Sequence, residues 1–390
     1  MKGMKTLRSG RNRRKWIYVL LLMGLLGLSG CGSPSSASVE MSSQTELVKT
    51  GSMELQYAEN FAVDYYEDGY KMLTTLPDSK RYLLVPEGQP VPRGLDEDVS
   101  ILQEPLQNIY LVASGVMDMF ASLDAVGQIR FSGQKQENWY IQTAKDAMAA
   151  GDMIYAGKYS KPDYELLVSE GCDLAIENRM ITHSPEVVEM LQSFDIPVMI
   201  EYSSYEQHPL GKVEWVKFFG ALTGKEAEAE EAFAEQTEIL EKVESGEKTG
   251  KTIAFFYVTS NGLIQVRQST DYIPKLIELA GGRYIFEDLE DSGSGRSTLN
   301  MQVENFYAGA KDADILIYNS SIDGGVTTLD ELIGKCNILK DFKAVQEGQV
   351  YCTTNDMYQQ SMAIGYLLQD MHTVLTDDDT AKLRYLFLLQ

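Results

Sequence analysis

The chain has 390 residues and a formal net charge of −23, from 57 acidic and 34 basic side chains. This excess of negative charge repels phosphate and anionic lipid headgroups, which argues against a nucleic-acid-binding protein. Apolar residues make up 44% of the sequence, enough for two lobes that each have a hydrophobic core.

The N-terminus has the pattern of an export signal. Seven basic residues lie between positions 2 and 15, an apolar run covers 16–28, and Leu28-Ser29-Gly30 precedes Cys31. The run is shorter than the roughly 20 residues of a membrane-spanning helix, so a cleaved signal peptide over residues 1–30 explains it better. The sequence at 28–31 resembles the bacterial lipobox, which implies lipidation of Cys31. The alternative is an ordinary signal peptide with an incidental cysteine.

Residues 31–52 are rich in serine and are expected to form a flexible lipid tether. Cleavage after residue 30 would remove seven positive charges and no negative one, which lowers the formal charge to about −30. No second apolar run approaches membrane length. We therefore expect the protein on the extracytoplasmic face of the cell membrane, attached through its N-terminal lipid only. A monomer is the default expectation for its oligomeric state.

Short apolar runs and amphipathic segments alternate in the first lobe, expected over 53–208. Its beginning, 53–104, is expected to be a β-rich addition. Strands are predicted at 109–113, 174–177 and 197–201, with helices at 139–149 and 185–193. Such alternation favours a parallel sheet covered by helices.

A helical connection is predicted over 209–246. Apolar residues recur at helical spacing in 210–222 and 225–243, with Gly224 between them, and the second stretch would be roughly 30 Å long. Alternation then resumes in a second lobe, 247–390, with strands predicted at 252–258, 314–318 and 349–352. The expected fold is α/β, with two lobes that each have a parallel sheet flanked by helices, joined by one long connecting helix.

Cysteine and histidine are too few and too scattered to predict a metal site or an intrinsic cofactor. If Cys31 is lipidated, three cysteines remain, so at most one disulfide can form, and Cys336 with Cys352 is one possibility. His208 lies near the expected crevice between the lobes and could bind a ligand, but His208-Pro209 is more typical of a helix start. Gly293-Ser294-Gly295 lacks the lysine of a phosphate-binding loop.

Several fragments in a fixed order resemble the iron-siderophore, haem and cobalamin binding proteins of ABC importers. The resemblance extends from about residue 99 to the C-terminus. Its fragments are Tyr159-Ser160-Lys161-Pro162-Asp163-Tyr164-Glu165, Gly171-Cys172-Asp173-Leu174-Ala175-Ile176, Phe194-Asp195-Ile196-Pro197-Val198, Ala280-Gly281-Gly282, and Glu304 followed by Lys311-Asp312-Ala313-Asp314-Ile315-Leu316-Ile317. The chain departs from the family over 53–104, and it has Gly-Cys-Asp where relatives often have Lys-Pro-Asp.

The resemblance implies a solute-binding protein that captures a ferric siderophore, haem or corrinoid and delivers it to an ABC import permease. In this family one acidic residue near a helix start in each lobe pairs with permease arginines, and Glu165 and Glu304 occupy those positions. The alternative is that both are ordinary exposed acids. The acidity of the chain argues against a strongly anionic siderophore and leaves haem, corrinoids and neutral or cationic siderophores open.

The ligand is expected in the crevice at the carboxyl ends of the parallel strands. Tyrosines there offer wide apolar faces with a polar tip, which suits a bulky chelate. Many of the 22 tyrosines must, however, lie in cores and lobe interfaces. The expected ligand contacts are Ser132, Tyr159, Tyr205, Arg267 and Tyr358.

Two other functions fit the same two-lobed protein. A secreted enzyme or chelatase would need a nucleophile with a base, or a close carboxylate pair, and the sequence has neither a Gly-x-Ser-x-Gly motif nor a histidine constellation. A scaffold or adhesion lipoprotein would need neither paired acidic residues nor a ligand. The expectation is therefore a binding protein and not an enzyme.

Overall fold

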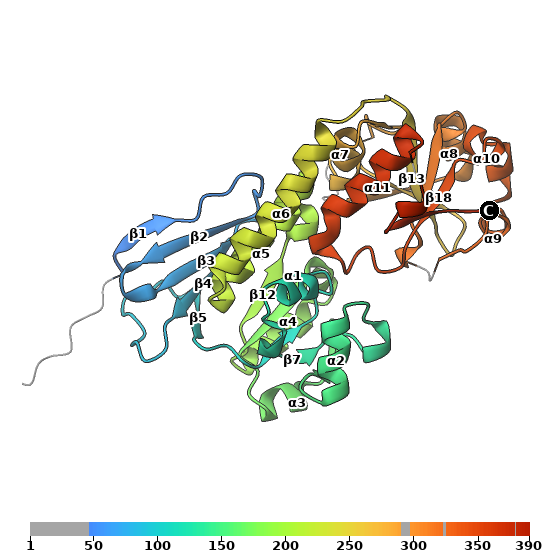
Figure 1. Ribbon diagram of the computed structural model, residues 1–390. Helices are drawn as coiled ribbons and strands as arrows, with labels where there is room; N and C mark the ends of the chain where they lie inside the picture. The colour runs from blue at the N-terminus through green and yellow to red at the C-terminus, as the bar shows by residue number, and fades with distance from the viewer. Residues whose placement is uncertain (1–46, 290–296, 323–324, 379) are drawn as a thin grey trace, which may run out of the picture. The chain divides into compact units, whose positions relative to one another are not determined.

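The computed structural model describes residues 47–289, 297–322, 325–378 and 380–390 (Figure 1). The expected signal peptide, Cys31, the tether up to residue 46 and the Gly293–Gly295 loop lie outside these residues. In the described part, no helix combines the length and the apolar character needed to cross a bilayer.

The β-rich addition is a five-stranded sheet with strands in sequence order. Neighbours are antiparallel except for the last pair, which is parallel. The first strand already lies within the range expected to be tether. The strands are β1 (Lys49–Ser52), β2 (Phe61–Tyr66), β3 (Lys71–Thr75), β4 (Lys80–Val85) and β5 (Val99–Gln103).

The first lobe has a five-stranded sheet in the order β12-β11-β6-β7-β8, and every neighbouring pair is parallel. The all-parallel arrangement agrees with the apolar runs of the sequence, because strands covered on both faces carry few polar residues. A small hairpin lies beside the sheet. The elements are β6 (Ile109–Leu111), α1 (Val116–Ser122), β7 (Ile129–Ser132), α2 (Gln142–Ala150), β8 (Ile154–Tyr155), β9 (Gly157–Lys158), β10 (Lys161–Pro162), α3 (Tyr164–Ser169), β11 (Leu174–Asn178), α4 (Pro185–Ser193) and β12 (Val198–Glu201).

The helical connection consists of two helices, α5 (Pro209–Thr223) and α6 (Glu226–Glu244). Gly224 separates them in a left-handed conformation with φ 72°, which a glycine adopts without steric cost. His208 caps α5, because its Nδ1 accepts a hydrogen bond from the Leu210 N–H at 3.2 Å. The longer helix α6 packs against α5 and α11 and leads into the second lobe (Figure 1).

The second lobe has a mixed sheet rather than a purely parallel one. Its parallel centre is β13-β17-β18, and β15 pairs parallel with β13, whereas β14, β16 and β19 are antiparallel. Cys336 and Cys352, which the sequence offered as a possible disulfide, are not joined by one. The elements are β13 (Thr252–Val258), β14 (Ile264–Arg267), α7 (Tyr272–Leu279), β15 (Arg283–Tyr284), β16 (Thr298–Met301), α8 (Val303–Ala310), β17 (Ile315–Tyr318), α9 (Leu329–Lys335), α10 (Lys343–Gln346), β18 (Val350–Thr353), α11 (Ile364–Thr376) and β19 (Leu386–Leu388).

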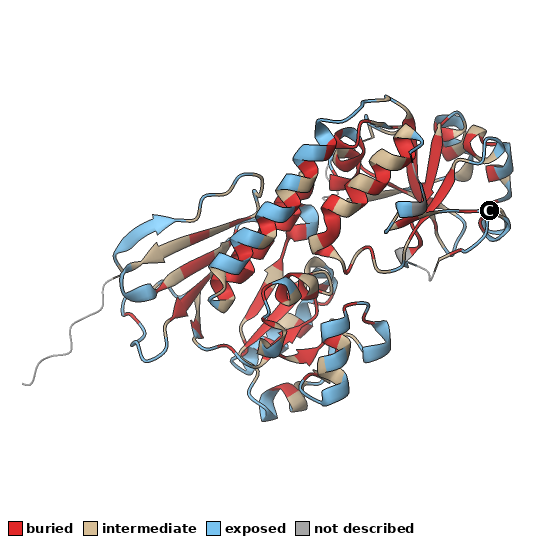
Figure 2. Cartoon of the chain, viewed as in Figure 1, coloured by how far each residue is buried: buried red, intermediate tan, exposed pale blue. Residues whose placement is uncertain are grey.

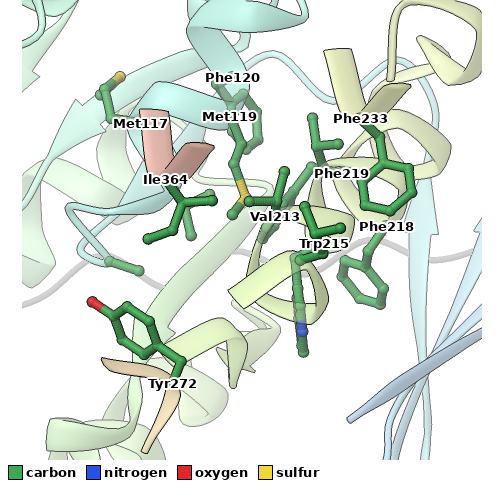
Figure 3. Packing of buried hydrophobic residues seen from close by; sticks show 14 of the residues in the cluster. Met117, Met119, Phe120, Val213, Trp215, Phe218, Phe219, Phe233, Tyr272 and Ile364 are labelled. Carbon is green, nitrogen blue, oxygen red and sulfur yellow. The ribbon is translucent and has the colours of Figure 1, made fainter. Parts of the chain in front are cut away.

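Helix α5 is the centre of the packing. Its residues from Pro209 to Leu222 are all buried, whereas α6 keeps one face exposed (Figure 2). One continuous cluster joins apolar side chains of α5 to those of α1, α6, α7 and α11 (Figure 3). Aromatic rings pack closely within it, as for Trp215 and Phe218, whose ring centres lie 5.1 Å apart. The two lobes therefore share one core around this helix.

The added sheet is attached to α5 and to the loop before it through two carboxylates. Glu214 accepts hydrogen bonds from the backbone N–H groups of residues 56, 57 and 58 at 2.8–3.1 Å. Glu206 accepts from the N–H groups of residues 59 and 60 at 2.9 and 3.0 Å, and from Trp215 Nε1 at 2.9 Å. The segment before β2 is thus tied to the centre of the molecule.

Candidate functional site: a cavity between the lobes

A cavity of about 220 Å³ opens where the two lobes meet. Most of its lining comes from the first lobe, with one residue from α5 and one from the second lobe. The lining residues are Ala113, Ser114, Gly115, Asn178, Arg179, Met180, Glu201, Ser204, Tyr205, Lys212 and Tyr358.

The carboxyl ends of three parallel strands position the first-lobe side. The segments that follow β6, β11 and β12 each contribute to the lining, which is where α/β sheets bind ligands. Arg179 follows β11 and lies over the ring of Tyr205, with 4.6 Å from its guanidinium carbon to the ring centre. This side of the cavity therefore combines an aromatic ring with a guanidinium group.

Tyr358 forms the second-lobe wall and follows β18. Its hydroxyl accepts a hydrogen bond from Asn319 Nδ2 at 2.6 Å and another from Arg267 Nη2. Arg267 is itself buried, and its Nη1 lies 3.2 Å from Asp271 Oδ2. Burial opposes the charge of Arg267, but the facing Tyr358 and Asp271 outweigh it, so the pKa of Arg267 is raised. Arg267 therefore supports Tyr358 from behind.

The segment after Tyr358 holds the lobes together beside the cavity. The Gln359 side chain accepts a hydrogen bond from the Tyr140 N–H and donates one to the Asn138 carbonyl, both at 2.8 Å. Asp118 of α1 accepts from the Met362 N–H at 2.7 Å. These three bonds cross from one lobe to the other.

Two opposite charges lie at the base of the cavity. Glu201 accepts hydrogen bonds from Ser203 N–H at 2.8 Å and Ser203 Oγ at 2.6 Å. Burial raises the pKa of Glu201, while the Ser203 bonds and Lys212 act against that rise. Burial lowers the pKa of Lys212, and Glu201 and Asp271 act against that fall. No carboxylate oxygen in the described residues lies within ion-pair distance of Lys212 Nζ.

Of the five residues expected to contact the ligand, two line the cavity and three do not. Tyr205 and Tyr358 line the cavity, and Arg267 lies directly behind Tyr358. Ser132 is buried outside the cavity, where its hydroxyl accepts a hydrogen bond from Trp139 Nε1 at 3.0 Å and closes a turn. Tyr159 lies in the β9–β10 hairpin and packs against the first-lobe core. Only part of the expected set is therefore brought together.

The two expected docking residues lie on separate helices. Glu165 is in the first turn of α3 and Glu304 in the first turn of α8, one in each lobe. Both side chains are exposed, and neither makes an ion pair with a described residue.

Two residues of the cavity base, Lys212 and Glu201, were not expected from the sequence. Lys212 belongs to a helix whose other side chains are mostly apolar, so a charged residue inside that run was the available indication. In the described ranges, no group of three or more His, Cys, Asp or Glu side chains is placed to hold a metal ion.

Comparisons with known proteins agree with this architecture. Two uncharacterized lipoproteins of Methanocaldococcus jannaschii are 24% and 23% identical to the chain, over 92% and 89% of it and 92% and 90% of their own lengths. A possible iron-binding periplasmic solute-binding protein from Staphylococcus epidermidis shares the fold, with a TM-score of 0.54 at 17% identity over 69% of this chain and 98% of that one. The periplasmic haem-binding protein of Vibrio cholerae has a TM-score of 0.54 at 15% identity, over 68% and 98%.

A family model described as a periplasmic binding protein matches residues 115–357, which is more than half of the sequence. The match begins after the five-stranded sheet of residues 49–103 and after β6, so both lie outside the matched region. It includes the cavity wall from Gly115 to Tyr205 and ends one residue before Tyr358. The chain belongs to the periplasmic binding protein family.

Proposed function

We propose that the protein captures a metal chelate, such as a ferric siderophore, haem or a corrinoid, and delivers it to an ABC import permease. The observation that carries this proposal is the cavity lined from both lobes, with Tyr205 and Arg179 on one side and Tyr358 on the other. Aromatic faces with a few fixed polar groups are the usual lining of small-molecule sites. The relatives described as iron-binding and haem-binding support the same class of ligand.

The size of the cavity restricts how such a ligand is held. Cavities for drug-sized ligands usually measure roughly 300–1,000 Å³, and this one has about 220 Å³. We propose that a compact part of the chelate enters the cavity, while bulkier parts extend past the exposed side chains of Met180 and Tyr205 at its rim.

A thermal-shift screen of residues 47–390 tests the binding function. The probes are haem, cyanocobalamin, ferric citrate and a ferric hydroxamate. A probe at about 100 times its dissociation constant adds roughly 2.7 kcal/mol to the unfolding free energy, which is visible as a raised Tm. A protein whose Tm is unchanged by every probe would contradict the proposed ligand class.

Delivery requires a surface that the permease can bind, and we propose that Glu165 and Glu304 provide it. Each is an exposed carboxylate in a different lobe, and a carboxylate can form a bidentate pair with an arginine. A lipid on Cys31 would keep the protein near the permease, and the relatives described as lipoproteins support this anchor.

The double variant Glu165→Ala/Glu304→Ala tests the docking surface. We expect unchanged affinity for the chelate and a loss of uptake of more than tenfold, measured with the radiolabelled chelate in cells. The matched control is Glu186→Ala/Asp330→Ala, which removes exposed first-turn acids of α4 and α9. Normal uptake by the first variant, or equal loss in both, contradicts the assignment.

A further inference from the structure

Helix α5 carries two buried lysines whose environments differ. Lys217 Nζ lies 2.9 Å from Glu230 and 3.6 Å from Glu214, so its charge is paired. Lys212 is equally buried, with 4% of its surface exposed, and its Nζ lies 4.9 Å from the centre of the Tyr272 ring. Its Nζ makes no hydrogen bond or ion pair in the described ranges, and Lys212 lines the cavity.

An unpaired ammonium in a core destabilises the fold, because burial removes its hydration without replacing it. A ring contact recovers only about 0.5–2 kcal/mol of that cost. A methionine or leucine would fill this buried position without the cost of removing a charge from water. Glu201 and Asp271 favour the charged form of Lys212 but do not pair with its Nζ. The ammonium is therefore left with free hydrogen-bonding capacity at a residue that lines the cavity.

The charges of the lining indicate what would complete the pairing. Arg179 and Lys212 are the lining residues with positive charge, and Glu201 is the one with negative charge. Glu201 and Asp271 act on Lys212 electrostatically, but in the described residues neither carboxylate lies within ion-pair distance of Lys212 Nζ. An oxyanion of the ligand beside Nζ would supply the partner that Lys212 lacks.

We propose that Lys212 binds a carboxylate of the ligand, so that the captured chelate is one that presents a carboxylate group. This inference rests on the proposed function and adds the chemical class of the chelate. Glu201, which Ser203 holds in place, also lines the cavity and reduces the positive charge that a ligand meets there. Because Lys212 belongs to the connecting helix, the carboxylate would lie deepest, with the rest of the ligand toward Tyr205 and Tyr358.

The test compares Lys212→Met with Lys217→Met, which changes a buried lysine of the same helix outside the cavity. Affinities are measured by calorimetry for ferric citrate, haem, a cationic ferric hydroxamate, cyanocobalamin and metal-free citrate. We expect Lys212→Met to lower the affinity for the carboxylate-bearing probes by about tenfold to a hundredfold, the range of a hydrogen bond to a charged group. Lys217→Met should change it less than twofold.

Folding of both variants is checked from their circular dichroism and Tm. Lys212→Met should keep or raise the Tm, because it removes an unpaired buried charge, and this separates lost binding from lost folding. A low Tm for Lys212→Met would show that the ammonium serves the fold and would overturn the inference.

The remaining outcomes separate the inference from the proposed function. Wild-type binding of chelates that is unchanged in Lys212→Met, or limited to probes without a carboxylate, overturns the inference and leaves the function standing. Binding of metal-free citrate alone, lost in Lys212→Met, supports the inference and overturns the proposed function. A wild-type protein that binds none of the five probes contradicts both.

Discussion

Two sides of helix α5 use buried charge in opposite ways. On the side that faces the added sheet, Glu214 accepts hydrogen bonds from the backbone N–H groups of residues 56–58 and forms an ion pair with Lys217. The buried charges on this side therefore have partners within the protein. Toward the cavity, Lys212 has no such partner in the described residues. Matched charges hold parts of a protein together, whereas an unmatched one indicates where another molecule completes the pairing.

The largest loss of stability should come from removing Glu214, the carboxylate on the side of α5 where buried charges are paired. Glu214→Ala would leave three partly buried backbone N–H groups without their acceptor and Lys217 with Glu230 alone, and removal of one partner from a buried pair costs about 3–5 kcal/mol. We expect this loss in urea unfolding, together with early proteolysis near residue 56. Glu230→Ala is the control, because 63% of that side chain is exposed and such pairs contribute less than about 1 kcal/mol. Equal losses in both variants would contradict the comparison.

Glu177 sharpens the comparison, because it is unmatched but lies away from the cavity. It is fully buried in β11, and neither of its oxygens has a hydrogen-bond partner in the described residues. Burial raises the pKa of Glu177 to about 8 from 4.5. The unfolded chain therefore releases this proton near pH 4.5 while the folded chain keeps it, so stability falls as the pH rises from about 4.5 to 8.

Glu177→Gln removes that dependence on pH. At pH 7.5 we expect the variant to be more stable than the wild type by about 1–3 kcal/mol, with no difference near pH 4.5. Urea unfolding at pH 4.5, 6.0 and 7.5 measures this difference. The exposed Glu186 of α4 gives the control, since Glu186→Gln should leave the pH dependence unchanged. Wild-type and Glu177→Gln curves that stay parallel would show that Glu177 is ionised in the folded protein.

The smallest effect should come from Ser203, which supports Glu201 at the cavity base. Ser203→Ala removes the 2.6 Å hydroxyl bond but keeps the backbone N–H bond at 2.8 Å, so we expect a loss of about 1 kcal/mol. Urea unfolding provides the measurement, with Ser193→Ala at the exposed end of α4 as the control. A loss above about 3 kcal/mol would contradict this expectation, because it would mean that the Ser203 hydroxyl and not the backbone N–H is the main partner of the buried Glu201.

Much of the fold follows from local sequence patterns. The apolar runs at 174–177 and 252–258 lie in β11 and β13, because buried parallel strands need continuous apolar residues. Helical spacing on either side of Gly224 predicted two helical stretches, and the structure has two helices there. Antiparallel edge strands such as β19 were not predicted, because an edge strand of three residues leaves almost no pattern.

The candidate site was less predictable because distant segments form it. The strand-end rule leads to Arg179 and Tyr205, since both follow predicted strands of one sheet. It does not distinguish Tyr358, which lines the cavity, from Ser132, which closes a turn beside Trp139. The rule that ligands bind at the ends of parallel strands does not predict Lys212, because this residue belongs to a helix and only the packing of α5 places it at the cavity.

The attachment of the added sheet sets a rule for sequence variation. Glu206 and Glu214 accept hydrogen bonds from the backbone N–H groups of residues 56–60, and Asn60 also contacts Glu206 through its side chain. Any residue except proline supplies such a group, so the backbone contacts themselves restrict these positions little, whereas Tyr57 is also held by its ring stacked on His208. Homologues that carry the same sheet should therefore be recognised by two glutamates eight residues apart around a helix start more readily than by the residues at positions 56 and 59 that those glutamates hold through the backbone.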